Sequence, residues 1–471
     1  MGVIYLDHLA ATPLHPRVKE AMIRYIETVF GNPSTDNQIG QPAAEALEQA
    51  RGQVAALINA EPKEVVFNSG GTESVNHAIK GVAIGLREKG RHIITSNIEH
   101  KSVLNSLRTL RLLDYRVTSL DVDKYGLVDP AAVEQAITPE TILISIMLAN
   151  NEIGTIEPIA DIAKIAQQRK VVMHTDAVAA TGIIPVDVQK LGVNLLSLAA
   201  NQFYGPAGVG ALYIRKGTPI WPLIDGGLQE NKRRAGAENL IGIVGMGMAA
   251  EMARIEMPER LPRIQALKDR LAKGLSERIP EIKINGHPTQ CLPNLFSVSV
   301  EYIEGESLVM MLDEEGIIVA TRSACASGSL RASHVLIGTG LTVESFGSIF
   351  HTWGVPSRDQ STLSGSTKAG TASRIAYTTA VMPSSTPADS PSSASRNRRP
   401  QAFRNEHYLP AGFSLGGSAT GFGASCFGIS GTFGGSIFGN SSGSLRATSK
   451  AGASNFGESN FGGSNLGVSN V

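Results

Sequence analysis

Short apolar runs alternate with stretches of helical periodicity from the start of the chain to about Phe350. Apolar runs bounded by turn residues are typical of buried strands, and apolar residues three and four apart indicate a helix packed on one face. Helical stretches include 43–59 and 160–170. The predicted strands are 64–70, 92–97, 142–148, 171–177, 195–200 and 210–216. This alternation predicts an α/β domain with a mostly parallel sheet between helices.

The pattern changes after Leu240, where a long helical stretch begins. It is followed by predicted strands at 282–286 and 296–302, a helix at 306–316 and a strand at 317–321. Such a mixture, without regular strand–helix alternation, indicates a smaller α+β domain. We therefore expect two folded domains.

A second change follows Phe350. Residues 351–471 are dominated by Ser, Gly, Thr, Pro and Ala and end in near-repeats such as SNFGESNFGGSN. So few large apolar residues cannot build a core, and the composition predicts a disordered Ser/Gly-rich low-complexity tail. We interpret the abrupt transition as a change of reading frame near Phe350, a hypothesis that sequencing of the locus would test.

Composition adds limits on partners and location. The 42 Lys and Arg balance the 42 Asp and Glu, so net charge does not draw the chain to nucleic acid or to a membrane surface. Three cysteines, Cys291, Cys325 and Cys426, are too few for a disulfide framework, which favours a reducing compartment. We find no secretory signal pattern and no run approaching the roughly 18 apolar residues of a membrane span. We expect a cytoplasmic protein without membrane or direct nucleic-acid partners.

Two polar clusters follow the first predicted strands. In SGGTES (69–74), glycines such as Gly71 let the backbone approach a phosphate, Thr72 adds a hydroxyl, and the start of a helix supplies amide donors. A simple helix cap explains the same residues. His100 follows the next strand, where a structural histidine is the alternative to a catalytic one.

Two more clusters follow later strands. Asp176 ends a predicted strand, at the edge where ligands gather in open α/β sheets, and it suits pairing with a protonated pyridine nitrogen of a cofactor. The alternative is that Asp176 caps the next helix. Asn151, in ANNEIGTIEP (149–158), either hydrogen-bonds a ring substituent or shapes a turn.

The last cluster is RSACASGS (322–329), a predicted loop of small residues around Cys325. A nucleophilic thiol needs access and a lowered pKa, and Arg322 would supply positive charge. A buried, inert cysteine is the alternative.

Taken together, these clusters resemble the cysteine desulfurases of the class V aminotransferase superfamily. The resemblance runs from about Ile4 to Ile349 through motifs in the family's order: YLDHLAATP, FGNPS, SGGTES, IEH, ANNEIGTIEP, HTDAV, FYGPAGVGALYIRKG, RRAGAEN, NGHP, YIEGES and RSACASGS. It implies the pyridoxal phosphate (PLP)-dependent transferase fold of type I. The large cofactor-binding domain would comprise residues 15–255, and the small domain residues 1–14 and 256–350, with Cys325 in the small domain.

The resemblance also implies roles for individual residues. Gly71 and Thr72 would hold the phosphate of PLP, and Asp176 would pair with its pyridine nitrogen. His100 would stack on the ring and move protons, and Asn151 would lie near the ring oxygen. The substrate would be L-cysteine.

The same family relationship implies partners. Cys325 would attack the substrate sulfur and carry it as a persulfide to an iron–sulfur scaffold or another acceptor protein. The enzyme would be a homodimer in which each active site is completed by the neighbouring subunit. No metal site is expected apart from Cys325 as a possible iron–sulfur ligand.

The chain departs from the family at the cofactor. Gln202 stands where the family has the lysine that forms the Schiff base, and an amide nitrogen cannot form an imine. Ala199 and Asn201 replace a serine and a histidine that hold the phosphate, and Ala179 replaces a glutamine that contacts the ring oxygen. Ala237 replaces a threonine that reaches the phosphate across the dimer. These changes resemble a lysine-lacking branch of the family, so we expect any PLP to be bound non-covalently.

A further departure follows the Gly-Ser-Ile stretch at 347–349, where the family pattern is lost. If the tail is genuine, we expect a small domain without its last strand and closing helices. Two functions stay open: a PLP-dependent cysteine desulfurase with a degenerate site, or a non-catalytic dimeric partner of an iron–sulfur scaffold that lends it Cys325. A plain aminotransferase is disfavoured because it also needs the lysine.

Overall fold

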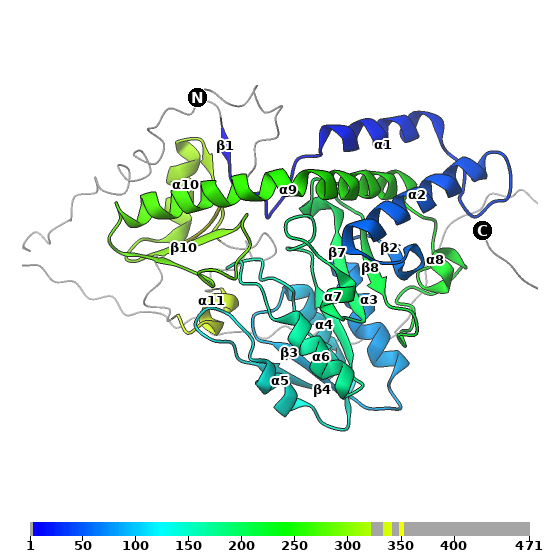
Figure 1. The fold of residues 1–471 in the computed structure, drawn as a ribbon, viewed down its shortest axis with the longest axis horizontal. Helices are drawn as coiled ribbons and strands as arrows, with labels where there is room; N and C mark the ends of the chain where they lie inside the picture. Colours follow the sequence, from blue (N-terminus) through cyan, green and yellow to red (C-terminus); the bar gives the residue numbers. More distant parts are fainter. Residues whose placement is uncertain (1–2, 322–332, 342–347, 353–471) are drawn as a thin grey trace, which may run out of the picture. The chain divides into compact units, whose positions relative to one another are not determined.

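A seven-stranded sheet organises the larger part of the structure, a computed structural model that describes residues 3–321, 333–341 and 348–352 (Figure 1). The strand order is β2-β8-β7-β6-β5-β3-β4, and β8 alone among these seven runs antiparallel to its neighbours. The strands are β2 (Val65–Asn68), β3 (His92–Ser96), β4 (Arg116–Leu120), β5 (Thr141–Ser145), β6 (Val172–Asp176), β7 (Leu195–Ala199) and β8 (Gly210–Ile214). The predicted mostly parallel α/β sheet is confirmed.

Helices cover both faces of this sheet because side chains alternate along each buried strand. In β7, Leu195 packs into a cluster with α3 and α4, whereas Leu196 packs into a cluster with α2, α6 and α9. The helices of this part are α1 (Pro16–Thr28), α2 (Gly40–Ile58), α3 (Gly71–Gly85), α4 (Lys101–Arg111), α5 (Pro130–Ala136), α6 (Ile159–Gln168), α7 (Val188–Leu191) and α8 (Gln229–Lys232), with short 3-10 turns η1 (Pro62–Glu64) and η2 (Ala200–Gln202).

Helix α9 (Leu240–Ser276) links the large sheet to a second core. Helix α9 runs from the large sheet to β10 (Figure 1). Met246 and Ala249 in its first half belong to the core of the large sheet, and Leu275 near its end belongs to a separate apolar cluster with β10. The domain boundary predicted at residues 255–256 therefore falls inside a continuous helix, and the domain limits stay predictions.

The second core is built on two small sheets. Strand β10 (Phe296–Val300) lies between β9 (Ile282–Ile284) and β12 (Ser348–Thr352), antiparallel to both. The N-terminal β1 (Ile4–Tyr5) pairs in parallel with β11 (Ile317–Ile318). The remaining helices are α10 (Gly305–Glu314) and α11 (His334–Gly338).

Strand β12 corrects one expectation. The loss of the family pattern after Ile349 predicted a small domain without its last strand, yet Ser348–Thr352 pairs with the whole of β10. A ladder of backbone hydrogen bonds needs no particular side chains, and a segment containing Ile, Phe and Thr has a high strand propensity. The disordered tail was predicted for residues 351–471; residues 351 and 352 instead belong to β12, and residues 353–471 lie outside the described residues.

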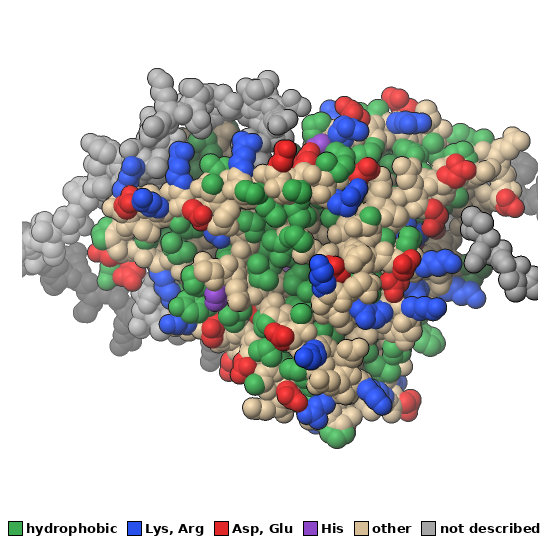
Figure 2. All heavy atoms as spheres, viewed as in Figure 1, with side chains coloured by type: hydrophobic (Ala, Val, Ile, Leu, Met, Phe, Trp, Pro, Cys, Tyr) green, Lys and Arg blue, Asp and Glu red, His purple; other side chains and the backbone are tan. Residues whose placement is uncertain are grey.

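Polarity is mixed over the visible surface. Lys and Arg side chains are interspersed with Asp and Glu on the face shown in Figure 2. Within the described part of the chain, no helix combines the length and the apolar character that crossing a membrane requires.

Candidate active site

A cavity of about 220 Å³ opens where the carboxyl ends of the parallel strands meet. This edge is where the chain leaves β3, β5, β6 and β7 toward their following segments, and it is the usual ligand site of such sheets. Six of the seven residues predicted from the sequence line the cavity; the seventh, Cys325, lies outside the described residues. The lining residues are Leu9, Ala10, Gly71, Thr72, His100, Ser102, Met147, Ala149, Asn151, Asp176, Val178, Ala179, Ala199, Asn201 and Gln202.

One wall is the loop that joins β2 to α3. Gly70 adopts φ +143°, a region closed to most side chains, and its N–H donates to Asn68 Oδ1 at 3.0 Å. At Gly71 a Cβ atom would lie 2.7 Å from Val178 Cγ2, so the loop approaches the β6 side of the cavity too closely for a larger residue. The 15-residue helix α3 starts at this wall with Gly71 and Thr72, and the unpaired amides of a helix N-terminus favour an anion.

Asp176 lies at the end of β6 and exposes only 7% of its surface. Burial raises the pKa of its carboxyl group, while the nearby His100 opposes the rise. Asp176 Oδ1 accepts a hydrogen bond from the Val178 N–H at 3.0 Å, so this carboxylate does cap the turn after β6. That bond occupies only one oxygen, and the residue also lines the cavity.

His100 is the N-cap of α4 and lines the same cavity. Its Nδ1 accepts the backbone N–H of Ser102 at 3.2 Å and lies 2.7 Å from Ser102 Oγ. Because an accepting Nδ1 carries no proton, the neutral ring carries its proton on Nε2. Sequence reasoning missed Ser102, although a polar residue two positions after a helix-capping side chain was a usable signal.

Asn151 lines the cavity, and its neighbour Asn150 shapes the turn. Asn150 Oδ1 accepts the N–H groups of Glu152 and Ile153, at 2.8 and 3.0 Å, and its Nδ2 donates to the Ile98 carbonyl at 3.0 Å. The turn bonds are thus made by Asn150, and the hydrogen bond of Asn151 to a ring substituent stays a prediction.

Behind His100 lies Glu99, a fully buried carboxyl group that sequence reasoning did not single out. Its Oε1 accepts hydrogen bonds from Ser96 Oγ at 2.8 Å and the Met147 N–H at 3.0 Å, and burial raises its pKa well above the ordinary value. The Glu99 carbonyl accepts from His334 Nε2 at 2.9 Å, which attaches α11 to the wall of the cavity. Glu99 was not predicted because hydrophobic periodicity along the sequence does not mark a buried carboxyl group beside a candidate histidine.

Gln202 lines the cavity from η2. Its Nε2 donates to the Leu9 carbonyl at 3.2 Å, and Thr12 Oγ1 donates to the Asn201 carbonyl at 2.7 Å. These bonds tie the turn that carries Gln202 to the N-terminal segment. None of the described residues that line the cavity is a lysine.

The cavity fits a phosphorylated aromatic cofactor held without a covalent bond. It combines a close-approach loop at a helix N-terminus, a buried carboxylate at the end of β6 and a histidine that follows β3. Within the described part of the chain, no group of three or more His, Cys, Asp or Glu side chains is arranged to hold a metal ion.

Comparison with known proteins agrees with this geometry. The family described as aminotransferase class-V matches residues 4–345. A cysteine desulfurase IscS of Dictyoglomus turgidum is 50% identical over 353 residues, which cover 75% of this chain and 90% of that protein. Another, from Methanosarcina thermophila, is 52% identical over 341 residues, covering 72% of this chain and 84% of that protein.

Solved structures give the same result. A NifS-like protein superposes with a TM-score of 0.73 at 34% identity, covering 81% of this chain and 100% of that one. The protein SspA in complex with cysteine gives a TM-score of 0.66 at 34% identity, covering 74% of this chain and 98% of that one.

Proposed function

The chain belongs to the class V aminotransferases and, within them, to the cysteine desulfurases; from this premise we propose that it removes sulfur from L-cysteine with PLP. The observation that carries the proposal is the convergence of Gly71, Thr72, His100, Asn151 and Asp176 on one cavity. PLP is the cofactor of this family, and when bound it supplies an electron sink for the substrate's α-carbon.

Different residues of the chain bind different groups of the cofactor. The amides at the start of α3 and the hydroxyl of Thr72 hold the phosphate group. Asp176 would pair with a protonated ring nitrogen, whose positive charge would oppose the burial that raises the pKa of this carboxyl group. Asn151 orients the ring through its oxygen substituent.

His100 and Cys325 handle protons and sulfur. His100 presents the protonated Nε2 to the cavity and moves a proton at that atom. The Cys325 thiolate attacks the substrate sulfur, so an S–S bond forms as the substrate's Cβ–S bond breaks and the Cβ carbon takes up a proton. The products are alanine and a persulfide on Cys325, which passes to an iron–sulfur scaffold or another acceptor protein.

Two further parts of the proposal concern assembly and location. We assign the protein to the cytoplasm and to a homodimer. The last turns of α1 support a second copy: Ile26 is 61% exposed, and Phe30 just beyond the helix is 87% exposed, which is a high apolar exposure for a surface left in water.

One observation favours a second candidate function. Because no lysine lines the described cavity and Gln202 cannot form an imine, the chain offers PLP no covalent attachment there. In this alternative the protein is a non-catalytic dimeric partner of an iron–sulfur scaffold, with Cys325 as sulfur acceptor or cluster ligand.

The deciding experiment uses the purified full chain with added PLP. The desulfurase requires an absorbance band that shifts on addition of L-cysteine, and sulfide release in dithiothreitol that depends on Cys325. A Cys325→Ser variant that releases as much sulfide rejects the role of that thiol. If the unmodified chain neither retains PLP nor releases sulfide, the desulfurase function is rejected and the partner function remains. The partner function requires a Cys325-dependent complex with a scaffold protein.

A further inference from the structure

Three consecutive residues that are not glycine adopt the left-handed conformation in α8: Glu230 (φ 48°), Asn231 (φ 56°) and Lys232 (φ 65°). This region is unfavourable for side chains with a Cβ atom, and single residues rather than runs adopt it. A run of three persists only where the surroundings hold it, and such runs collect at sites where a precise backbone position matters.

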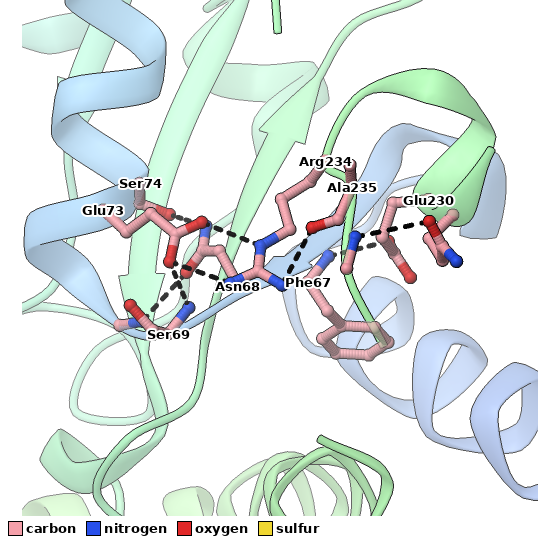
Figure 3. Close-up of polar contacts among 11 residues, drawn as sticks. Phe67, Asn68, Ser69, Glu73, Ser74, Glu230, Arg234 and Ala235 are labelled. Atoms are coloured by element: carbon pink, nitrogen blue, oxygen red, sulfur yellow. Dashed lines mark hydrogen bonds and ion pairs between the residues drawn. The ribbon is translucent and has the colours of Figure 1, made fainter. Parts of the chain in front are cut away.

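A buried ion pair holds the first residue of this turn. Arg51 of α2 donates to both carboxylate oxygens of Glu230 at 2.8 Å, and the side chains expose 5% and 2% of their surface. Glu230 Oε2 also accepts the Phe67 N–H of β2 at 2.8 Å (Figure 3). The turn is therefore fixed to β2, which leads directly into residues 69–72. These residues join β2 to α3 and include the first two residues of α3, and they are called the 69–72 loop below.

A second ion pair involves Arg234, which follows the left-handed turn by two residues. Arg234 reaches the first turn of α3, where its Nε lies 3.0 Å and its Nη2 3.4 Å from the two oxygens of Glu73 (Figure 3). Glu73 Oε2 in turn accepts the Ser69 N–H at 2.9 Å. Burial by itself would raise the pKa of Glu73, but the hydrogen bonds from Arg234 and Ser69 lower it, so the carboxylate stays charged.

The loop has a further internal support. Asn68 accepts from the Gly70 N–H and donates through Nδ2 to Ser74 Oγ at 2.7 Å, and Ser74 Oγ donates to the Ala211 carbonyl of β8. Asn68 and Ser74 fix the inner side of the loop, whereas Glu73 and Arg234 fix its outer side. Arg51, Glu73, Glu230 and Arg234 are absent from the described lining of the cavity, so any effect on a ligand passes through the loop.

We propose that Arg51–Glu230 and Arg234–Glu73, joined by the left-handed turn 230–232, position the 69–72 loop for the phosphate of the cofactor. These four are positioning residues, since they act on the ligand through backbone amides that they hold in place. The proposal rests on the function proposed above, because it assigns the 69–72 loop to the phosphate of PLP.

The test compares PLP with pyridoxal, which lacks the phosphate. Arg234→Met and Glu73→Gln should each weaken PLP binding about tenfold, the usual effect of losing one charge-assisted contact, and leave pyridoxal binding unchanged. Arg169→Met, which breaks an exposed ion pair with Glu134, is the matched control and should leave both affinities unchanged. Arg234→Lys, which keeps the charge, should recover part of the preference for PLP.

A second readout needs no ligand. Hydrogen exchange of a peptide covering 68–74 should be faster in Arg234→Met than in the unmodified protein, because the Ser69 N–H loses an ordered acceptor. Unchanged exchange, or equal loss of PLP and pyridoxal binding, overturns the proposal.

The turn itself is tested with Glu230→Gln. We expect a lower melting temperature together with a smaller ratio of PLP to pyridoxal affinity. A lower melting temperature at an unchanged ratio assigns Arg51–Glu230 to stability alone and overturns its part in positioning. If the unmodified chain binds pyridoxal as tightly as PLP, the phosphate site of the proposed function fails, and the proposal fails with it.

Discussion

The side-chain amide of Gln202 donates to the backbone carbonyl of Leu9, 193 residues away in the sequence. The bond draws the N-terminal segment to the cavity and occupies a nitrogen that has no basic lone pair. Gln202 lines the cavity at the position of the family's lysine, and its amide cannot form a covalent link to PLP. The cavity keeps Asp176, His100 and Thr72, and this combination yields the first prediction.

Gln202→Lys should give the protein a Schiff-base absorbance band with added PLP. The reason is that a lysine amine at this position reaches the same cavity, while Asp176, His100 and the 69–72 loop are already in place. Absorbance after removal of free PLP by gel filtration is the measurement, with Gln202→Met as the control. A variant that elutes without PLP would show that Ala179, Ala199 or Asn201 limits binding.

Asp176→Asn should lower sulfide release by roughly a hundredfold or more. An asparagine keeps the acceptor that caps the Val178 N–H but removes the charge that keeps the ring nitrogen protonated. Single-turnover assays at saturating PLP separate this effect from weaker binding. An unchanged rate would mean that Asp176 serves only the turn after β6.

Glu157 makes stability depend on pH. Burial, with a contribution from Asp123, raises the pKa of Glu157 to about 8, against 4.5 for the free side chain, although the Val128 N–H bond opposes the rise. A raised carboxyl pKa means that the folded state binds more protons, so this contribution to stability is complete below about pH 4.5 and is lost as pH rises toward 8.

Glu157→Gln should therefore be more stable than the unmodified protein at pH 8.5, by an amount of the order of a few kcal/mol, and similar to it near pH 5. The glutamine keeps an oxygen for Val128 and never ionises. Denaturant unfolding at both pH values is the measurement. A stability difference that does not vary with pH would contradict the prediction.

Arg51→Met should lower the free energy of unfolding by about 3–5 kcal/mol, because it leaves Glu230 buried without its partner. Arg169→Met breaks an ion pair whose side chains expose 53% and 46%, and should cost less than about 1 kcal/mol. Equal losses in the two variants, measured by urea unfolding, would argue against a special role for the buried pair.

Asn231→Gly should raise stability by about 0.5–1 kcal/mol, because glycine adopts the left-handed region without a Cβ penalty. Asn231→Val should lower it, since a β-branched residue suits that region least. Melting curves of both variants test the prediction, and a lower melting temperature for the glycine variant would indicate that the turn is not strained.

Prediction from sequence succeeded where periodicity was strong. All six predicted strands of the large sheet are present, and each is short and buried along its whole length. The edge strand β4 was missed because its RVTSL sequence is partly exposed and lacks such a run. β12 was expected to be absent because family residues were missing, whereas strand pairing depended only on the backbone.

The sequence by itself determined the α/β fold, the family and six candidate site residues that line the cavity, because motif order and residue chemistry are properties of the chain. Only the tertiary structure decided which asparagine of the pair 150–151 lines the cavity, where the amide of Gln202 is bound, and that Arg51 pairs with Glu230 and Arg234 with Glu73. These relationships join residues up to 193 positions apart, and such contacts exist only after the strands and helices have packed.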